Sequence, residues 1–225
     1  MSRRPPQAPG EAPRWTLTRR RWLGAAAASL GLAACGRRRP KAQRLAPGAT
    51  VLALGDSITY GTGAATPASY PAVLAALTGW NVVNAGVPGD TSAQALARTP
   101  ELLAEHAPAL VIVSIGGNDF LRRLSEADTR ANVRRICELV RAARAQVLLV
   151  AVPRPTAAAA VTGSLSDHPM YEALSAELEL PLHREGWASV LAEEALRSDR
   201  IHANAEGYRR FAEGVAATAR EAGLL

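Results

Sequence analysis

The feature that most constrains the fold is a series of short, almost continuous apolar runs separated by segments with helical periodicity. Runs of this kind, without polar alternation, are typical of strands that are covered on both faces. The candidate strands are 51–54, 81–84, 110–115 and 147–152, with a weaker fifth near 180–183. The candidate helices are 68–78, 92–105, 126–144, 168–179, 188–196 and 205–221, and Pro100 is expected to break or kink the second. This alternation predicts one α/β domain over 50–225, a three-layer α/β/α sandwich around a mostly five-stranded parallel sheet.

The first 34 residues have the composition of an export signal. Leu23–Ala34 is an apolar stretch of 12 residues, too short to span a bilayer comfortably but suited to a signal-peptide core. The preceding Thr18–Leu23 resembles a twin-arginine signal, and Leu32–Cys35 resembles a bacterial lipobox. We therefore expect residues 1–34 to be an export signal. The alternatives are a short buried helix with a stray cysteine, or cleavage without lipidation.

The lipobox resemblance makes Cys35 the expected lipidation site and the start of the mature chain. Residues 35–49 would then be a tether rich in Arg, Pro and Ala, with a basic run that suits anionic headgroups. The expected location is the periplasmic or cell-surface side of a membrane, to which the lipid anchors the chain. The other cysteine, Cys137, lies in a predicted helix and is interpreted as a buried, inert thiol.

The distribution of charge argues against a nucleic-acid partner. The net charge of +6 comes mainly from residues 1–34, which hold six arginines and one glutamate. The remainder has 20 basic and 19 acidic residues, so the predicted domain lacks the basic face that a phosphate backbone requires. No Cys/His cluster has the spacing of a zinc site, and no metal or cofactor is expected. A monomer is favoured.

Small and polar residues follow the first three predicted strands. They are Gly55-Asp56-Ser57, Asn84 to Gly89, and Gly116-Gly117-Asn118-Asp119. Because ligands of open parallel sheets bind beyond the carboxyl ends of the strands, these three tips are expected to share one site. A serine at such a tip can act as a nucleophile only when a base lies beside it.

His202 is the histidine best placed in sequence to be that base. His106, His168 and His183 stand in no comparable motif, whereas Asp199 precedes His202 by three residues in a turn. A carboxylate at that spacing can hold imidazole Nδ1 and leave Nε2 free to take a serine proton.

The chain resembles the SGNH hydrolases, also called GDSL esterases, in particular the bacterial branch of arylesterases, thioesterases and lysophospholipases. The four motif blocks occur in order: Gly55-Asp56-Ser57, Asn84-x-Gly86-x-x-Gly89, Gly116-Gly117-Asn118-Asp119, and Asp199-x-x-His202. One departure is that Arg200 and Ala203 stand where Gly and Pro often flank the final histidine. The resemblance covers about residues 50–222 and implies a flavodoxin-like strand order.

The resemblance also implies a mechanism and a substrate class. Ser57 would be the nucleophile, His202 the base and then the acid, and Asp199 its orienter. The oxyanion hole would comprise the N–H groups of Ser57 and Gly86 and the side-chain amide of Asn118. The substrates would be carboxylic esters: aryl or short-acyl esters, lysophospholipids or acyl-thioesters.

Other residues near the strand tips have more modest interpretations. Asp56 and Asp119 are expected to bond loop amides and take no part in catalysis. The loop over 154–167 follows the fourth strand, and Arg154, Pro155 and Thr156 are candidates for the substrate pocket.

Two rival functions remain open at this point. A binuclear metallophosphoesterase also places Gly-Asp and Gly-Asn at strand tips, but it needs several more histidines and carboxylates. A catalytically inactive lipoprotein could bind lipids or glycans on the same fold. Intact Ser57, Asn118 and His202 argue against this binder, because binding alone requires none of the three.

Overall fold

Five parallel strands form a single sheet at the centre of the domain. The computed structural model describes Met1, residues 42–154 and residues 165–225. The strands are β1 (Thr50–Gly55), β2 (Asn81–Gly86), β3 (Leu110–Ser114), β4 (Gln146–Val150) and β5 (Leu182–His183). Their order is β2-β1-β3-β4-β5, and every neighbouring pair is parallel. The predicted α/β sandwich with a flavodoxin-like, five-stranded sheet is confirmed.

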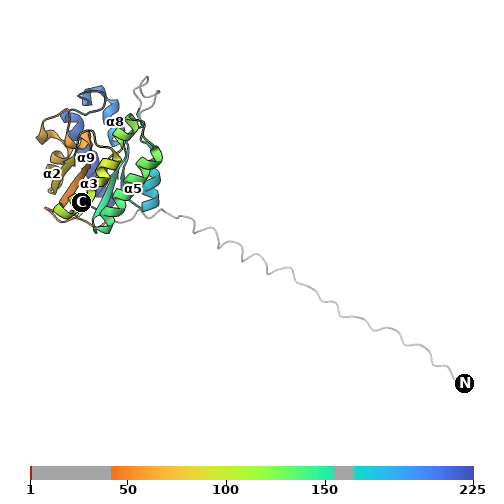
Figure 1. Cartoon of the computed structure of the whole chain (residues 1–225). Helices are drawn as coiled ribbons and strands as arrows, with labels where there is room; N and C mark the ends of the chain where they lie inside the picture. Colours follow the sequence, from red (N-terminus) through yellow and green to blue (C-terminus); the bar gives the residue numbers. More distant parts are fainter. Residues whose placement is uncertain (2–41, 155–164) are drawn as a thin grey trace. The chain divides into compact units, whose positions relative to one another are not determined.

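Helices cover both faces of the sheet, with α2, α8 and α9 on one face and α3, α5 and α7 on the other (Figure 1). The helices are α1 (Ser57–Tyr60), α2 (Tyr70–Thr78), α3 (Ser92–His106), α4 (Gly117–Leu121), α5 (Glu126–Ala142), α7 (Pro169–Leu178), α8 (Gly186–Ala192) and α9 (Ala205–Ala222). Two short 3₁₀ turns, η1 (Thr66–Ala68) and η2 (Glu194–Leu196), complete them. Within the described residues, no helix is long and apolar enough to cross a bilayer.

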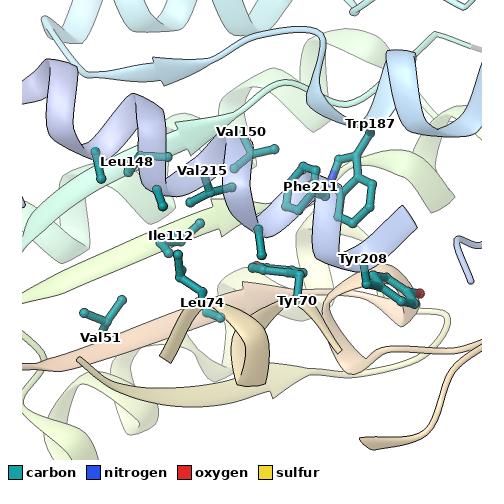
Figure 2. Packing of buried hydrophobic residues seen from close by; sticks show 14 of the residues in the cluster. Val51, Tyr70, Leu74, Ile112, Leu148, Val150, Trp187, Tyr208, Phe211 and Val215 are labelled. Atoms are coloured by element: carbon teal, nitrogen blue, oxygen red, sulfur yellow. The ribbon is translucent and has the colours of Figure 1, made fainter. Parts of the chain in front are cut away.

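Alternate residues of each strand pack into two separate hydrophobic cores, one on each face of the sheet. Both faces of the strands are therefore apolar, which explains the continuous apolar runs in the sequence. Val51 and Ala53 of β1 pack toward α2 and α9, whereas Leu52 and Leu54 pack toward α3 and α5. Figure 2 shows the first core, where aromatic side chains from three helices meet over the sheet. In it, Trp187 stacks on Phe211 with ring centroids 3.5 Å apart, and the Trp187 Nε1–H donates to Ser114 Oγ at 3.0 Å.

Some predicted elements differ from the structure in continuity or extent. Helix α3 runs unbroken through Pro100, because a capping box at Thr91 and burial of one face offset the single hydrogen bond that a proline removes. The helix predicted over 188–196 begins at Gly186 and gives way to η2, since Glu193 between them is extended. The fifth strand is an edge strand of only two residues.

The two ends of the sheet carry different parts of the chain. At the amino ends of the strands, the segment from Ala42 to Leu45 pairs with the C-terminus: the Leu45 N–H donates to the Leu224 carbonyl at 2.9 Å. At the carboxyl ends lie Ser57, the loop after β2 and the start of α4. The chain leaves β1 for β2 on one side and later returns to β3 on the other, so the tip of β1 is the topological switch point where such folds bind ligands.

Candidate active site

Ser57 stands at the tip of β1 as the first residue of the short helix α1. The Asp56 carboxylate caps this helix by accepting from the Ile58 N–H at 3.1 Å. A side chain at Gly55 would bring its Cβ within 2.0 Å of Thr59 Oγ1 and 2.6 Å of the Ser114 carbonyl oxygen. Only glycine therefore allows this turn to close against β3, and the closed turn places the serine on the rim of the sheet.

The structure brings Ser57, His202 and Asp199 into one hydrogen-bonded chain. His202 Nε2 lies 2.9 Å from Ser57 Oγ, and His202 Nδ1 lies 2.7 Å from Asp199 Oδ2. Since a carboxylate only accepts, Nδ1 carries the proton in this contact, and Nε2 is left to accept from the serine hydroxyl. This is the arrangement in which an imidazole can deprotonate an attacking serine.

The turn that carries His202 is closed by Asp199 itself. Asp199 Oδ1 accepts from the N–H groups of Ile201 and His202 at 2.8 and 2.9 Å. Partial burial works to raise the pKa of Asp199, but the hydrogen bonds from the His202 ring and from these two N–H groups outweigh it, so the pKa lies below its usual value. One carboxylate thus shapes the turn and faces the imidazole.

Asn118 lies on the first turn of α4, and its side-chain amide contacts Asp56, the residue before Ser57. Its Nδ2 donates to the Asp90 carbonyl at 2.9 Å and makes a longer contact of 3.4 Å with Asp56 Oδ2. Both acceptors belong to loops at the carboxyl edge, so the amide group points into the same region as Ser57. The first and third predicted motif blocks therefore meet, as expected from the fold.

Gly86 packs at the end of β2, directly against α1. A Cβ at this position would lie 2.2 Å from the Tyr60 nitrogen and 2.8 Å from the Asp56 carbonyl oxygen. Glycine is thus required here by the close packing of the end of β2 against α1. Its N–H donates to Asn84 Oδ1 at 3.0 Å.

Asp56 and Asp119 both accept from backbone N–H groups near the strand tips, as predicted, and Asp119 also accepts from two hydroxyl groups. Asp119 is buried and accepts from the Ser92 N–H, the Ser92 hydroxyl and the Thr129 hydroxyl at 2.8, 2.6 and 3.3 Å. Asp56 is also buried, and the loss of solvent raises its pKa to about 6. Both carboxyl groups tie the strand tips together.

The remaining histidines and the described cysteine are scattered. His168 caps α7, and His183 lies buried in β5 with Nδ1 2.8 Å from Thr218 Oγ1. Cys137 is fully buried, as predicted, and burial raises its thiol pKa to about 12. Over 42–154 and 165–225, no three His, Cys, Asp or Glu side chains gather as metal ligands would.

Of the predicted pocket residues, only Arg154 is described. Its Nη2 lies 3.3 Å from Glu126 Oε1. Arg154 lines a pocket of about 270 Å³ together with Phe120, Arg123, Leu124 and Glu126. One of these lining residues, Phe120, lies on α4 two residues after Asn118. Pro155, Thr156 and the predicted lipidation site Cys35 lie outside the described residues.

One residue near the site was missed from the sequence. Arg98, on the second turn of α3, donates through Nε to Asp90 Oδ2 and through Nη2 to the Gly55 carbonyl, both at 2.8 Å. It follows Asp90 by eight residues and belongs to no motif block, and no local pattern marks a contact of this kind. It links the loop after β2 to the strand that carries Ser57.

Known proteins match this chain in sequence and in structure. Residues 53–210 match the model of the GDSL-like lipase/acylhydrolase family. The chain is 42% identical over 116 residues to "Thioesterase 1/protease 1/lysophospholipase L1" of Escherichia coli, and 41% identical over 111 residues to "Esterase TesA" of Pseudomonas aeruginosa. These alignments cover 50% and 47% of this chain, and the chain spans about half the length of each of these curated relatives, 55%.

A solved structure extends the match to nearly a whole domain. The crystal structure of TesA is 33% identical, with a TM-score of 0.68, and the match covers 77% of this chain and 99% of that chain. The family model spans all four motif blocks and the sheet that carries them. The chain belongs to the GDSL-like lipase/acylhydrolase family.

Proposed function

We propose that this chain is a serine esterase that hydrolyses carboxylic esters through an acyl-enzyme. The observation that carries the proposal is the hydrogen-bonded chain from Ser57 through His202 to Asp199, at the switch point of the sheet. Family membership and relatives named as esterases and a thioesterase support the same chemistry.

In the proposed mechanism the acyl group passes from the ester to Ser57 and then to water. Ser57 Oγ attacks the acyl carbon while His202 Nε2 takes its proton, and the imidazolium is stabilised by Asp199. His202 then gives this proton to the departing alcohol or thiol. A water molecule, deprotonated by the same nitrogen, releases the acid and returns the proton to Ser57.

The negative charge on the acyl oxygen needs donors at the strand tips. The Ser57 N–H is the first of α1 and has no acceptor within the helix. The Asn118 amide contacts the side chain of Asp56, the residue before Ser57, at 3.4 Å. Gly86 is the predicted third donor, although its N–H would have to leave Asn84 Oδ1 to take part. No described residue accepts from the Gly89 N–H in the same motif block, which makes it a second candidate. A phosphonate adduct structure decides between them by which N–H lies ~2.7–3.1 Å from the phosphoryl oxygen.

The proposed substrates are aryl or short-acyl esters, lysophospholipids and acyl-thioesters. Support comes from the names of the relatives, which include an "Arylesterase" of Vibrio mimicus that is 33% identical over 110 residues. The pocket beside Arg154 is the proposed site for part of the substrate. Turnover measured with p-nitrophenyl esters of two to sixteen carbons, for wild type and Arg154→Ala, tests this. An unchanged chain-length preference would place the acyl group elsewhere.

We further propose that residues 1–34 direct export and that lipidated Cys35 anchors the domain to a membrane through residues 35–49. The Leu32–Cys35 pattern supports this proposal. In a bacterium that processes lipoproteins, wild type should carry a lipid mass on Cys35 and sediment with membranes, whereas Cys35→Ser should be released. A wild-type protein without lipid on Cys35 would contradict the anchor.

Covalent labelling tests the central proposal. A fluorophosphonate probe should label wild type at Ser57, and an aryl acetate should give a burst of product, with EDTA having no effect on either. A folded protein that binds lipid but is neither labelled nor active would instead be a binder. Activity lost in EDTA and restored by a divalent metal would favour the metallophosphoesterase.

A further inference from the structure

We propose that Arg98 is a positioning residue that holds the Asn118 amide in register with Ser57. The effect of Arg98 on turnover that is derived below rests on the proposed esterase function. Arg98 lies on α3 and reaches the site through two other segments, the loop after β2 and the end of β1. It touches neither Ser57 nor Asn118 directly, so its effect passes through the groups that it binds.

The first connection runs to the proposed oxyanion donor. Arg98 Nε donates to Asp90 Oδ2 at 2.8 Å, and the carbonyl of the same Asp90 accepts from Asn118 Nδ2 at 2.9 Å. The side chain of Asp90 is only 9% exposed, and Arg98 makes its one salt bridge among the described residues. Fixing the Asp90 carboxylate therefore fixes the residue whose carbonyl orients the amide.

The second connection runs to the nucleophile. Arg98 Nη2 donates to the Gly55 carbonyl at 2.8 Å, two residues before Ser57. The same carbonyl accepts from the Val87 N–H at 3.1 Å, and the Asp90 N–H donates to the Val87 carbonyl at 3.1 Å. The end of β1 and the 87–90 turn thus meet at one oxygen, and the guanidinium bridges them from the side.

The guanidinium is suited to this task by its shape. Its planar fork presents Nε and Nη2 in fixed directions, so a carboxylate and a carbonyl that it binds are held at a fixed separation. A lysine ammonium supplies the charge at a single point on a flexible stem and does not impose that separation. The distance between the Asn118 amide and Ser57 consequently depends on an arginine at this position.

The consequence for catalysis follows from how oxyanion donors act. Their contribution depends on placement relative to charge that develops in the transition state, while ground-state binding of the substrate depends on it little. A displacement of about 1 Å in a positioned group can cost roughly 10²-fold in rate. Loss of Arg98 should therefore lower kcat and leave KM nearly unchanged.

The test compares Arg98→Met with Arg134→Met, a matched control. Arg134 pairs with Glu138 and Glu177 on exposed surface of α5 and makes no contact with the site. Arg98→Met should lower kcat for p-nitrophenyl acetate by about 10–100-fold with KM within threefold, and Arg134→Met should change neither. Arg98→Lys, which leaves no unpaired buried carboxylate, should fold even if Arg98→Met does not, and should lose at least fivefold in kcat.

A double-variant cycle shows whether the effect passes through Asn118. If it does, adding Arg98→Met to Asn118→Ala should lower kcat by less than threefold beyond Asn118→Ala alone. A kcat within twofold of wild type in folded Arg98→Met or Arg98→Lys would overturn the proposal. So would a full, multiplicative loss in the Asn118→Ala background.

A spectroscopic readout separates this inference from the proposed function. The Asn118 side-chain NH₂ signal in a ¹⁵N–¹H spectrum, assigned by its disappearance in Asn118→Ala, should shift in Arg98→Met and stay in place in Arg134→Met. An unmoved signal would refute the positioning role. If wild type hydrolyses no ester, the proposed function fails, and the NH₂ signal still decides whether Arg98 positions the amide.

Discussion

The two sides of the candidate site are held in place by different means. The strand-tip side, Gly55–Ser57 with Asp90 and Asn118, is cross-linked by side chains from α3 and α4. The histidine loop, residues 198–203, is held largely by its own hydrogen bonds, and the Asp199 side chain is 53% exposed. The geometry around Ser57 therefore depends on residues distant in sequence, whereas the geometry around His202 depends on a local motif. Substitutions can separate the two.

Removing the contact between the two sides should have the largest effect. Ser57→Ala and His202→Ala should each lower kcat by about 10⁶, because the attack then lacks its nucleophile or its base. Ser57→Ala should also lose all fluorophosphonate labelling. The measurement is turnover of an aryl ester, with circular dichroism as the control for folding. Full activity in folded His202→Ala would disprove the triad.

Within the histidine loop, the effect of the Asp199 charge on His202 can be separated from the role of Asp199 in closing the turn. Asp199→Asn keeps an oxygen that can accept from the Ile201 N–H, so the turn should still close. It removes the carboxylate that fixes the His202 tautomer, and kcat should fall by about 10⁴. Pre-steady-state turnover reports the loss of the catalytic charge, and the melting temperature reports any loss of the turn, so the two measurements separate these roles of Asp199. Unchanged turnover with an unchanged melting temperature would make Asp199 a turn residue only.

On the strand-tip side, Asn118→Ala should be milder and different in kind. Nucleophile and base are intact, so the probe should still label Ser57, although slowly. Turnover should fall by about 10²–10³, the loss expected for one oxyanion donor, with KM within threefold. Steady-state kinetics on the purified variant check this split. Near-wild-type turnover would remove Asn118 from the oxyanion hole and leave the triad standing.

The smallest effect concerns stability and depends on the buried His183. Burial lowers the pKa of His183 to about 4 from 6.5, so the unfolded chain binds its proton first as the pH falls. His183 should therefore cost about 3 kcal/mol of stability between pH 6.5 and 4. The raised pKa of Asp56, about 6, acts in the opposite sense over part of this range.

Because Asp56 and His183 change the stability in opposite directions, the contribution of His183 is obtained from the difference in stability between wild type and a variant that lacks this histidine. Urea unfolding of wild type and His183→Gln should be compared from pH 7 to pH 4. The variant should lose less stability than wild type over this range, since glutamine does not titrate. Parallel curves would show that His183 takes up its proton at the same pH in the folded and the unfolded chain, and would contradict the lowered pKa.

The sequence predicted the sheet and the histidine loop well because both depend on local signals. Continuous apolar runs mark strands buried on both faces, and the Asp199–His202 spacing fits within one turn. The three strand tips were expected to meet because parallel strands end at a common edge, and Ser57 and Asn118 do so.

Features that depend on tertiary packing were not predicted. The continuity of α3 through Pro100 depends on burial of its inner face, which propensity does not reveal. The need for glycine at position 86 arises from α1, an element of four residues with no periodic signal. Arg98 meets Gly55, 43 residues away, only after two strands have paired.

The pairing of the segment from Ala42 to Leu45 with the C-terminus also determines how the domain can be attached to a support. Gln43 donates its N–H to the side chain of Gln146, the first residue of β4, so both ends of the described domain lie at the amino edge of the sheet. Ser57 lies at the opposite edge, about 20 Å away along six residues of β1. Attaching the domain to a support at Ala42 or at Leu225 should therefore leave the edge that carries Ser57 directed away from the support, accessible to bulky or aggregated esters.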